Sequence, residues 1–104
     1  MAARWRFWRS GKPAKRVDGA TVSHLDDFVA RRRGVEAYIE PETTLTRTTL
    51  LLVAFDGEWT RRSIESARWG REFARRHGLP VYDAGVVGYP QRMRDYNARR
   101  KSSE

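Results

Sequence analysis

The first residues that could carry out binding chemistry are three arginines interleaved with three large rings near the start of the chain. They are Arg4, Trp5, Arg6, Phe7, Trp8 and Arg9. Guanidinium groups bind phosphates, and aromatic faces stack on unpaired bases, so this segment is typical of single-strand nucleic-acid binding. Three alternatives remain open at this point: insertion at an anionic membrane surface, contact with a protein partner, and packing onto the rest of the same chain.

Two further groups of arginines lie in predicted helices. Arg68, Arg71 and Arg75 are spaced by three and four residues, which puts them on one helix face. The last predicted helix carries Arg92, Arg94, Arg99 and Arg100. The row of Arg68, Arg71 and Arg75 can hold a phosphate backbone without choosing a sequence, while a solvated helix face is the alternative explanation.

Pro90 is placed to start that last helix, whose first turn leaves backbone N–H groups free. Together with Arg92 and Arg94, these groups could form an anion site. The alternative is that Tyr89 and Met93 fasten the helix to the sheet while its charges face water.

Candidates for catalysis are few. Asp56, Glu58 and Asp83 lie near predicted strand ends, where hydrolases and nucleases often keep carboxylates, but no spacing completes a nuclease motif. His24 and His77 are the two histidines, and without cysteine they predict no metal site. Neither G-x-G-x-x-G nor G-x-x-x-x-G-K-[ST] occurs, so we predict no bound cofactor.

Positive charge is concentrated at both ends of the 104-residue chain, whose formal net charge is +8. Residues 1 to 20 carry six basic side chains and one acidic side chain. Residues 21 to 66 carry six basic and eight acidic side chains, and residues 67 to 104 carry nine basic and four acidic side chains. This distribution favours polyanions. Eighteen of the 21 basic residues are arginine, which suits phosphate binding, although a GC-rich genome would explain the bias equally well.

The composition sets the broad class of protein. A chain of this length has room for one domain with one hydrophobic core. Without cysteine, disulfides and thiol chemistry are excluded. The sequence has no apolar run as long as a membrane span and no signal peptide, so we expect a cytoplasmic protein.

Hydrophobic periodicity predicts the first elements after a basic arm at residues 1–20. A helix capped by Thr21 or Ser23 ends in arginines before Gly34. Residues 35–40 alternate as a strand with one buried and one wet face. Residues 48–55 and 58–64 form a hairpin around Asp56-Gly57, and a two-residue turn would pair Ala54 with Trp59, Val53 with Thr60 and Leu52 with Arg61.

The second half predicts a helix at residues 67–77, capped by Ser66 and ended by Gly78, with Glu72 paired to Arg76. A strand at 81–87 should lie parallel to a neighbour. The fold expected is α+β, a two-layer sandwich of order α-β-β-β-α-β with a three-stranded antiparallel meander and a short C-terminal helix. The predicted parts are the arm 1–20, a single domain 21–90, and a basic helix and tail 91–104.

Three segments carry a resemblance to known proteins: FVARRRGVEAYIEP (28–41), AFDGEWTRR (54–62) and LPVYDAGVVGYPQRMRDY (79–96). They resemble a family of small, uncharacterised actinobacterial proteins, some of which carry the name oxidoreductase. The resemblance covers nearly the whole chain and implies an oxidoreductase, or a subunit of one, with a bound flavin or nicotinamide. It assigns no active-site residue.

From the residues themselves, we predict a non-enzymatic protein that binds RNA or another polyanion, with ribosomal RNA ahead of DNA. The binding residues would be the arm, the Arg68 face and the C-terminal helix. The alternatives are the oxidoreductase and an adaptor for a protein or a membrane surface. The oligomeric state stays open.

Overall fold

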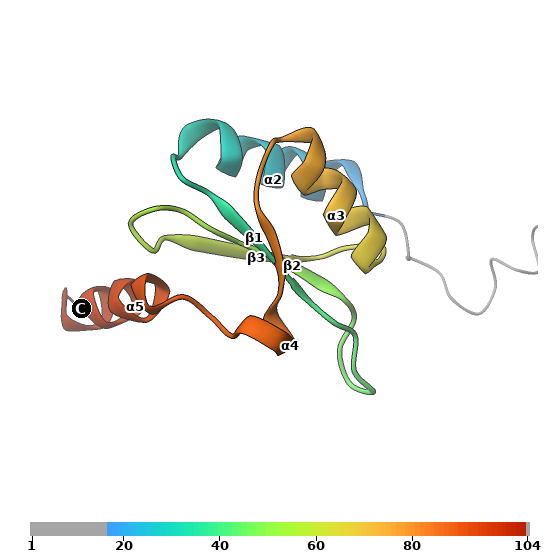
Figure 1. Cartoon of the computed structure of the whole chain (residues 1–104). Coiled ribbons are helices and arrows are strands. Elements are labelled where there is room, and N and C mark those ends of the chain that lie inside the picture. The colour runs from blue at the N-terminus through green and yellow to red at the C-terminus, as the bar shows by residue number, and fades with distance from the viewer. Residues whose placement is uncertain (1–16, 104) are drawn as a thin grey trace, which may run out of the picture.

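The computed structural model describes residues 17–103, which form a four-stranded sheet with helices on its two faces (Figure 1). The strands are β1 (Glu36–Glu40), β2 (Thr49–Val53), β3 (Trp59–Ser63) and β4 (Val81–Asp83), and the helices are α2 (Gly19–Arg31), α3 (Ala67–Arg76), α4 (Ala84–Val87) and α5 (Gln91–Ser103). The strand order is β3-β2-β1-β4. β1, β2 and β3 are antiparallel neighbours, whereas β4 runs parallel to β1 after the α3 crossover.

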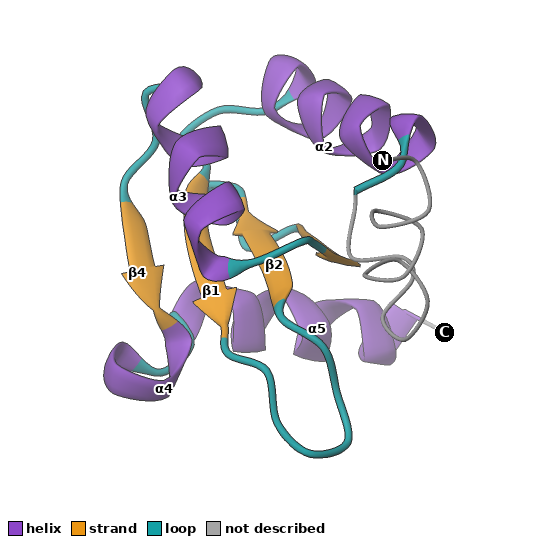
Figure 2. Cartoon of the chain, turned by 90° about the vertical axis from the view of Figure 1, so that its right-hand side faces the viewer, coloured by secondary structure: helices purple, strands orange, loops and turns teal. Residues whose placement is uncertain are grey.

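The two faces of the sheet are covered by different helices (Figure 2). α2 and α3 pack on one face through Leu25, Phe28 and Phe73, which meet Leu50 and Leu52 of β2. On the other face the buried residues include Leu51, Val53, Ala84 of α4 and Met93 of α5. Because β2 is buried on both faces, it is a continuous apolar run instead of an alternating one.

The predicted α+β class, the antiparallel meander and the C-terminal helix are confirmed. The prediction of a wet face on β1 is wrong. Tyr38 points away from α2 and α3, yet it is only 5% exposed and belongs to the cluster with Ala84 and Met93. The chain that follows β4 returns across this face, a long-range contact that the alternation in β1 cannot reveal.

The β2–β3 hairpin has a three-residue turn, so the predicted register is wrong by one residue. Val53 pairs with Trp59, and the Ala54 N–H donates to the Glu58 carbonyl at 2.8 Å. Gly57 has φ +95° and donates its N–H to the Ala54 carbonyl at 2.9 Å. The chain uses the left-handed conformation of Gly57 as a bulge after the turn, which places Phe55 in the turn and outside the strand.

Caps fix where several elements begin. Asp18 Oδ1 accepts the Thr21 N–H at 2.8 Å, so α2 begins at Gly19, and the prediction that Thr21 or Ser23 caps it is wrong. The predicted arm 1–20 therefore overlaps α2, and its residues 1–16 lie outside the described residues. Ser66 caps α3 as predicted.

The predicted strand 81–87 is too long. β4 ends at Asp83, where Oδ1 accepts the Gly85 N–H at 2.8 Å and starts the single turn of α4. Asp83 therefore acts as a helix cap.

Candidate functional site

Four arginines stand on the outer side of α3: Arg68, Arg71, Arg75 and Arg76, the α3 basic face. All four are exposed. The single carboxylate of the helix, Glu72, pairs with Arg75 at 2.9 Å, so the predicted Glu72–Arg76 pair is wrong. Within residues 17–103, Arg68 and Arg71 have no ion pair, which leaves their charges open to an external anion.

The packing of α3 turns these arginines outward. Gly70, Phe73 and Ala74 are buried against the sheet. A Cβ on Gly70 would lie 2.9 Å from Ile64 Cδ1 and 3.1 Å from Ile39 Cδ1, so glycine allows the helix to approach closely. With the apolar side of the helix fixed in this way, the arginine spacing places the guanidinium groups in solvent.

α5 carries a second group of cations, called here the α5 basic face: Arg94, Arg99, Arg100 and Lys101. At about 3.6 residues per turn these side chains project from several sides of the helix and do not form one row. All four are exposed. The one acidic residue of α5, Asp95, accepts a hydrogen bond from Gln91 at 3.0 Å. Arg99 Nη2 donates to the Asp56 carbonyl at 3.0 Å, which ties this face to the β2–β3 turn.

Arg92 is directed into the fold. Its Nε donates to the Ala54 carbonyl at 2.9 Å and its Nη2 donates to Glu36 Oε1 at 2.9 Å. Met93 beside it is buried, and Tyr89 donates its hydroxyl hydrogen to Glu40. The contacts of Met93 and Tyr89 are those of the fastening alternative, but Arg92 does not face water as that alternative expected. We therefore assign Arg92 to the fold and leave it out of the candidate surface.

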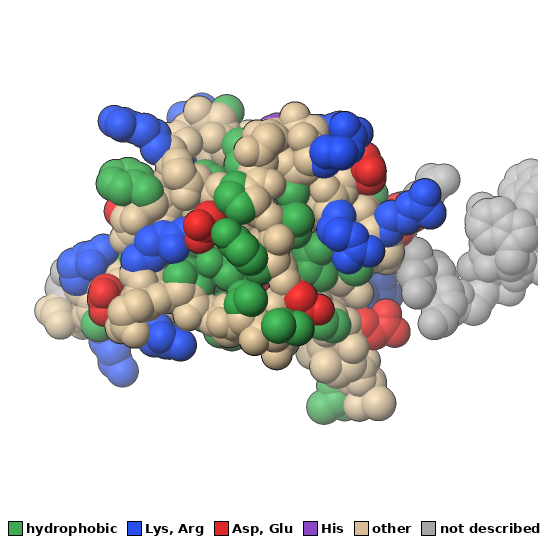
Figure 3. Space-filling view, in the orientation of Figure 1, with side chains coloured by type: hydrophobic (Ala, Val, Ile, Leu, Met, Phe, Trp, Pro, Cys, Tyr) green, Lys and Arg blue, Asp and Glu red, His purple; other side chains and the backbone are tan. Residues whose placement is uncertain are grey.

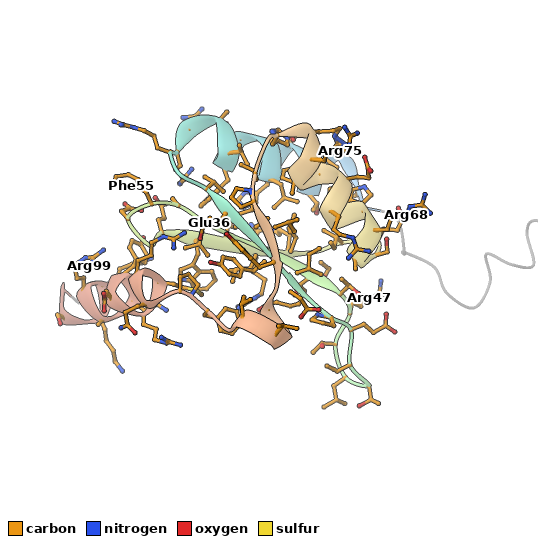
Figure 4. The ribbon with its side chains drawn as sticks, in the orientation of Figure 1. Glu36, Arg47, Phe55, Arg68, Arg75 and Arg99 are labelled. Atoms are coloured by element: carbon orange, nitrogen blue, oxygen red, sulfur yellow. The ribbon has the colours of Figure 1, made fainter. Side chains whose placement is uncertain are left out.

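The two basic faces are separate in space. In the view of Figure 4, Arg68 and Arg75 lie at one end of the molecule and Arg99 at the other. Figure 3 shows Lys and Arg side chains toward both ends, with hydrophobic side chains between them. An extended anion could contact both faces, whereas a small one would occupy either.

The remaining predicted binding residues, Arg4, Trp5, Arg6, Phe7, Trp8 and Arg9, lie outside the described residues. The structure therefore adds nothing to their assignment.

The carboxylates considered for catalysis are used by the fold. Asp56 accepts the Glu58 N–H at 3.0 Å inside the turn, Glu58 pairs with Arg32 at 2.7 Å, and Asp83 caps α4. Nowhere in residues 17–103 do three or more His, Cys, Asp or Glu side chains gather as metal ligands would. None of these positions forms an acid–base pair.

The two histidines have separate partners. His24 Nε2 lies 2.6 Å from the Thr60 hydroxyl, and His77 Nε2 lies 2.9 Å from Asp26 Oδ1. Burial, followed by the nearby charges of Arg62 and Arg32, lowers the pKa of His24. Both contacts join helices to other parts of the fold: α2 to β3, and α2 to the end of α3.

A partly buried carboxylate that sequence reasoning missed is Glu40, at the end of β1. Its Oε1 accepts from the Thr49 hydroxyl at 2.6 Å and from Arg61 Nε at 2.7 Å, while Oε2 accepts from Arg61 Nη2 at 2.9 Å and from Tyr89. Burial would raise the pKa of Glu40, but the bonds from Arg61, Thr49 and Tyr89 together lower it. With both oxygens engaged by two donors each, Glu40 is a structural anion.

Sequence reasoning also missed Phe55. This residue is 63% exposed at the turn between β2 and β3. The apolar run of residues 48–55 suggests a buried strand, so nothing in the local pattern distinguishes Phe55 from its neighbours.

The fold and these surfaces define a small α+β protein with two exposed cationic helix faces. Comparison of the chain with protein-family models, curated proteins and solved structures finds no match. None of the helices in the described part of the chain is long and apolar enough to span a membrane. The functional assignment therefore rests on the chain's own residues.

Proposed function

We propose that this chain is a non-enzymatic accessory protein that binds RNA, with ribosomal RNA as the foremost candidate. One observation carries the proposal: the α3 and α5 basic faces together expose eight cationic side chains, and their helices hold only two carboxylates, Glu72 and Asp95. A phosphate backbone is the common cellular partner for such surfaces.

The local carboxylates leave most of this charge available. The Arg75–Glu72 pair is highly exposed, at 71% and 54% of the two side chains. Exposed pairs are screened by water and salt, so a phosphate can compete with Glu72 for Arg75. A phosphate can bind Arg68 and Arg71 without displacing a carboxylate.

The preference for RNA over duplex DNA rests on the aromatic residues of the arm. Trp5, Phe7 and Trp8 can stack only on bases that are not already stacked on both sides. Loops and single strands of RNA offer such bases.

The test is a salt series with fluorescently labelled RNA, run on the full chain and on the triple variant Arg68→Gln, Arg71→Gln, Arg75→Gln. Counterion release predicts that the affinity of the wild type falls steeply with salt, with a logarithmic slope of about 0.7 for each single-strand phosphate that the protein neutralises. The triple variant should show weaker binding and a shallower slope.

A control for a single lost charge is Arg31→Gln, since Arg31 is an exposed arginine of α2 that lies outside both basic faces. It should leave the slope nearly unchanged. If the wild type does not bind RNA at low salt, the proposal is wrong.

The oxidoreductase and the adaptor remain predictions of a different class. A flavin or nicotinamide absorbance in the purified protein would support the first. Binding to anionic vesicles, or to one protein after nuclease treatment, would support the second.

A further inference from the structure

The turn between β2 and β3 presents a single ring to solvent. Phe55 is 63% exposed, and it points outward at the same end of the molecule as Arg99 (Figure 4). An isolated exposed apolar side chain is common on protein surfaces. What distinguishes Phe55 is how firmly its backbone is held and which charges surround it.

Hydrogen bonds from three segments fix the turn. The Phe55 N–H donates to the Arg33 carbonyl at 2.9 Å. Gly57 closes the turn onto Ala54, and Arg99 donates to the Asp56 carbonyl at 3.0 Å. A ring mounted on a fixed backbone loses little conformational freedom when it binds.

The chain segment that precedes β1 also packs closely against the turn, at Phe55. Gly34 has φ +60°, and a Cβ there would lie 2.9 Å from Phe55 Cβ. Glycine thus allows the end of α2 to lie directly against the base of the ring, and the exposed residue Arg33 comes with it.

Exposed arginines belong to the two segments that contact this turn. Arg33 follows α2, and Arg99 and Arg100 belong to the α5 basic face. Figure 3 shows a hydrophobic side chain at this end with Lys and Arg side chains on either side of it. Of the nearby carboxylates, Glu58 is paired with Arg32, and Asp56 accepts a backbone hydrogen bond within the turn.

We propose that Phe55 is a stacking site for an unpaired base of single-stranded RNA, with Arg33 on one side and Arg99 and Arg100 on the other contacting the phosphates. The inference rests on the proposed RNA binding and specifies which kind of RNA is bound. In a duplex, each base face is covered by its neighbours, so one protruding ring has nothing to stack on. A single strand offers both free faces and a flexible backbone.

The experiment compares a labelled 12-nucleotide oligouridylate with an RNA duplex of the same length, at several salt concentrations, using the full chain. Phe55→Ala should weaken binding to the single strand by about 5- to 150-fold, the range that base–ring stacking gives. Its salt slope should be unchanged, since every arginine that meets a phosphate is retained. Binding to the duplex should be unaffected.

Three variants sharpen the comparison. Phe55→Trp keeps a flat ring and should retain the affinity. Arg33→Gln should reduce the salt slope. Leu45→Ala changes a residue that is 92% exposed on a different loop and should have no effect. Because Phe55 and Leu45 are exposed, thermal unfolding should show that both alanine variants are folded.

Two results would overturn the stacking site, and they are distinguishable from failure of the proposed function. If Phe55→Ala binds the single strand as tightly as the wild type does, and wild-type binding still depends on salt, then Phe55 is not a stacking site. The proposed RNA binding would still stand. An equal loss of affinity for the single strand and the duplex would also exclude the stacking site, because the ring would then not be stacking on unpaired bases. No binding by the wild type to either RNA would overturn both proposals.

Discussion

Arg92 of α5 and Glu36 of β1 form an ion pair across 56 positions of sequence, with Arg92 Nη2 2.9 Å from Glu36 Oε1. The same oxygen accepts the Tyr38 hydroxyl at 2.9 Å. Each side chain of the pair is 29% exposed. Because Met93 is the one residue of the described α5 that is buried, this polar junction is a main attachment of the terminal helix to the sheet.

Replacing Arg92 should therefore loosen α5. Arg92→Met keeps much of the aliphatic length but removes the hydrogen bonds to Glu36 and Ala54, and hydrogen bonds to charged groups of this kind contribute about 1.5 to 3 kcal/mol. We expect a loss of that order in the free energy of unfolding by urea, with faster amide exchange along α5. Arg94→Met, which alters an exposed arginine of the same helix, is the control and should change little.

Replacing Gly57 by alanine should cost more stability than replacing Gly78 by alanine. Both glycines have positive φ, +95° and +66°, which disfavours alanine by about 1 to 2 kcal/mol. A Cβ on Gly57 would in addition collide with the Arg92 carbonyl oxygen and lie 2.8 Å from Tyr96 Cβ, whereas nothing lies within 4 Å of one on Gly78.

Gly57→Ala should consequently lower the melting temperature more than Gly78→Ala. Equal effects would mean that α5 does not press against the hairpin as described.

The hydrogen bonds that Glu40 accepts from Arg61, Thr49 and Tyr89, here called the Glu40 cluster, should make the free energy of unfolding fall in acid. The pKa of Glu40 is lowered from its usual 4.5, so the folded chain releases this proton more readily than the unfolded chain. The resulting stability is fully present above pH 4.5 and is lost as pH falls through the lowered pKa. Unfolding of Glu40→Gln by urea, measured from pH 7 downward, should differ most from wild type at neutral pH.

The difference in free energy of unfolding between Glu40→Gln and the wild type should narrow below pH 4.5. Glu42→Gln removes an equal charge from the exposed loop beyond Pro41 and provides the comparison. A constant difference between Glu40→Gln and wild type at every pH would contradict the cluster.

His24 should remain neutral to lower pH than a free histidine. Burial, aided by Arg62 and Arg32, lowers its pKa from 6.5. The unfolded chain then takes up the proton first, so the stability contributed by His24 is present above pH 6.5 and is lost as pH falls through the folded-state pKa.

A nuclear magnetic resonance titration of the imidazole should give a midpoint below 6.5. His24→Gln should flatten the fall in stability in that range. A midpoint above 6.5 would show that the charged form is favoured and would contradict the burial of His24 against Thr60.

Much of the fold could be predicted from local patterns. The apolar run around Leu51 predicts the central strand, Ser66 and Gly78 correctly bound α3, and Pro90 correctly precedes α5. These features depend on neighbours in sequence, since caps, turns and helix periods are set within about four residues.

The errors came where a choice depended on competing geometry. Asp18 caps α2 ahead of Thr21, and Gly57 makes the turn three residues long. Each alternative agreed with the local pattern of residues. At Gly57 the close approach of Arg92 and Tyr96 of α5 is a contact that this local pattern does not contain.

The sequence by itself determined the chemistry available: an arginine-rich chain with positive ends, no cysteine and a sheet-forming centre. Only the tertiary structure decided which of those groups remain free. Arg92 and Arg68 look alike in sequence, but contacts distant along the chain hold Arg92 against Glu36 and leave Arg68 in solvent. Phe55 likewise resembles its buried neighbours until the turn excludes it from the sheet, because exposure is a property of packing and cannot be read from residue type alone.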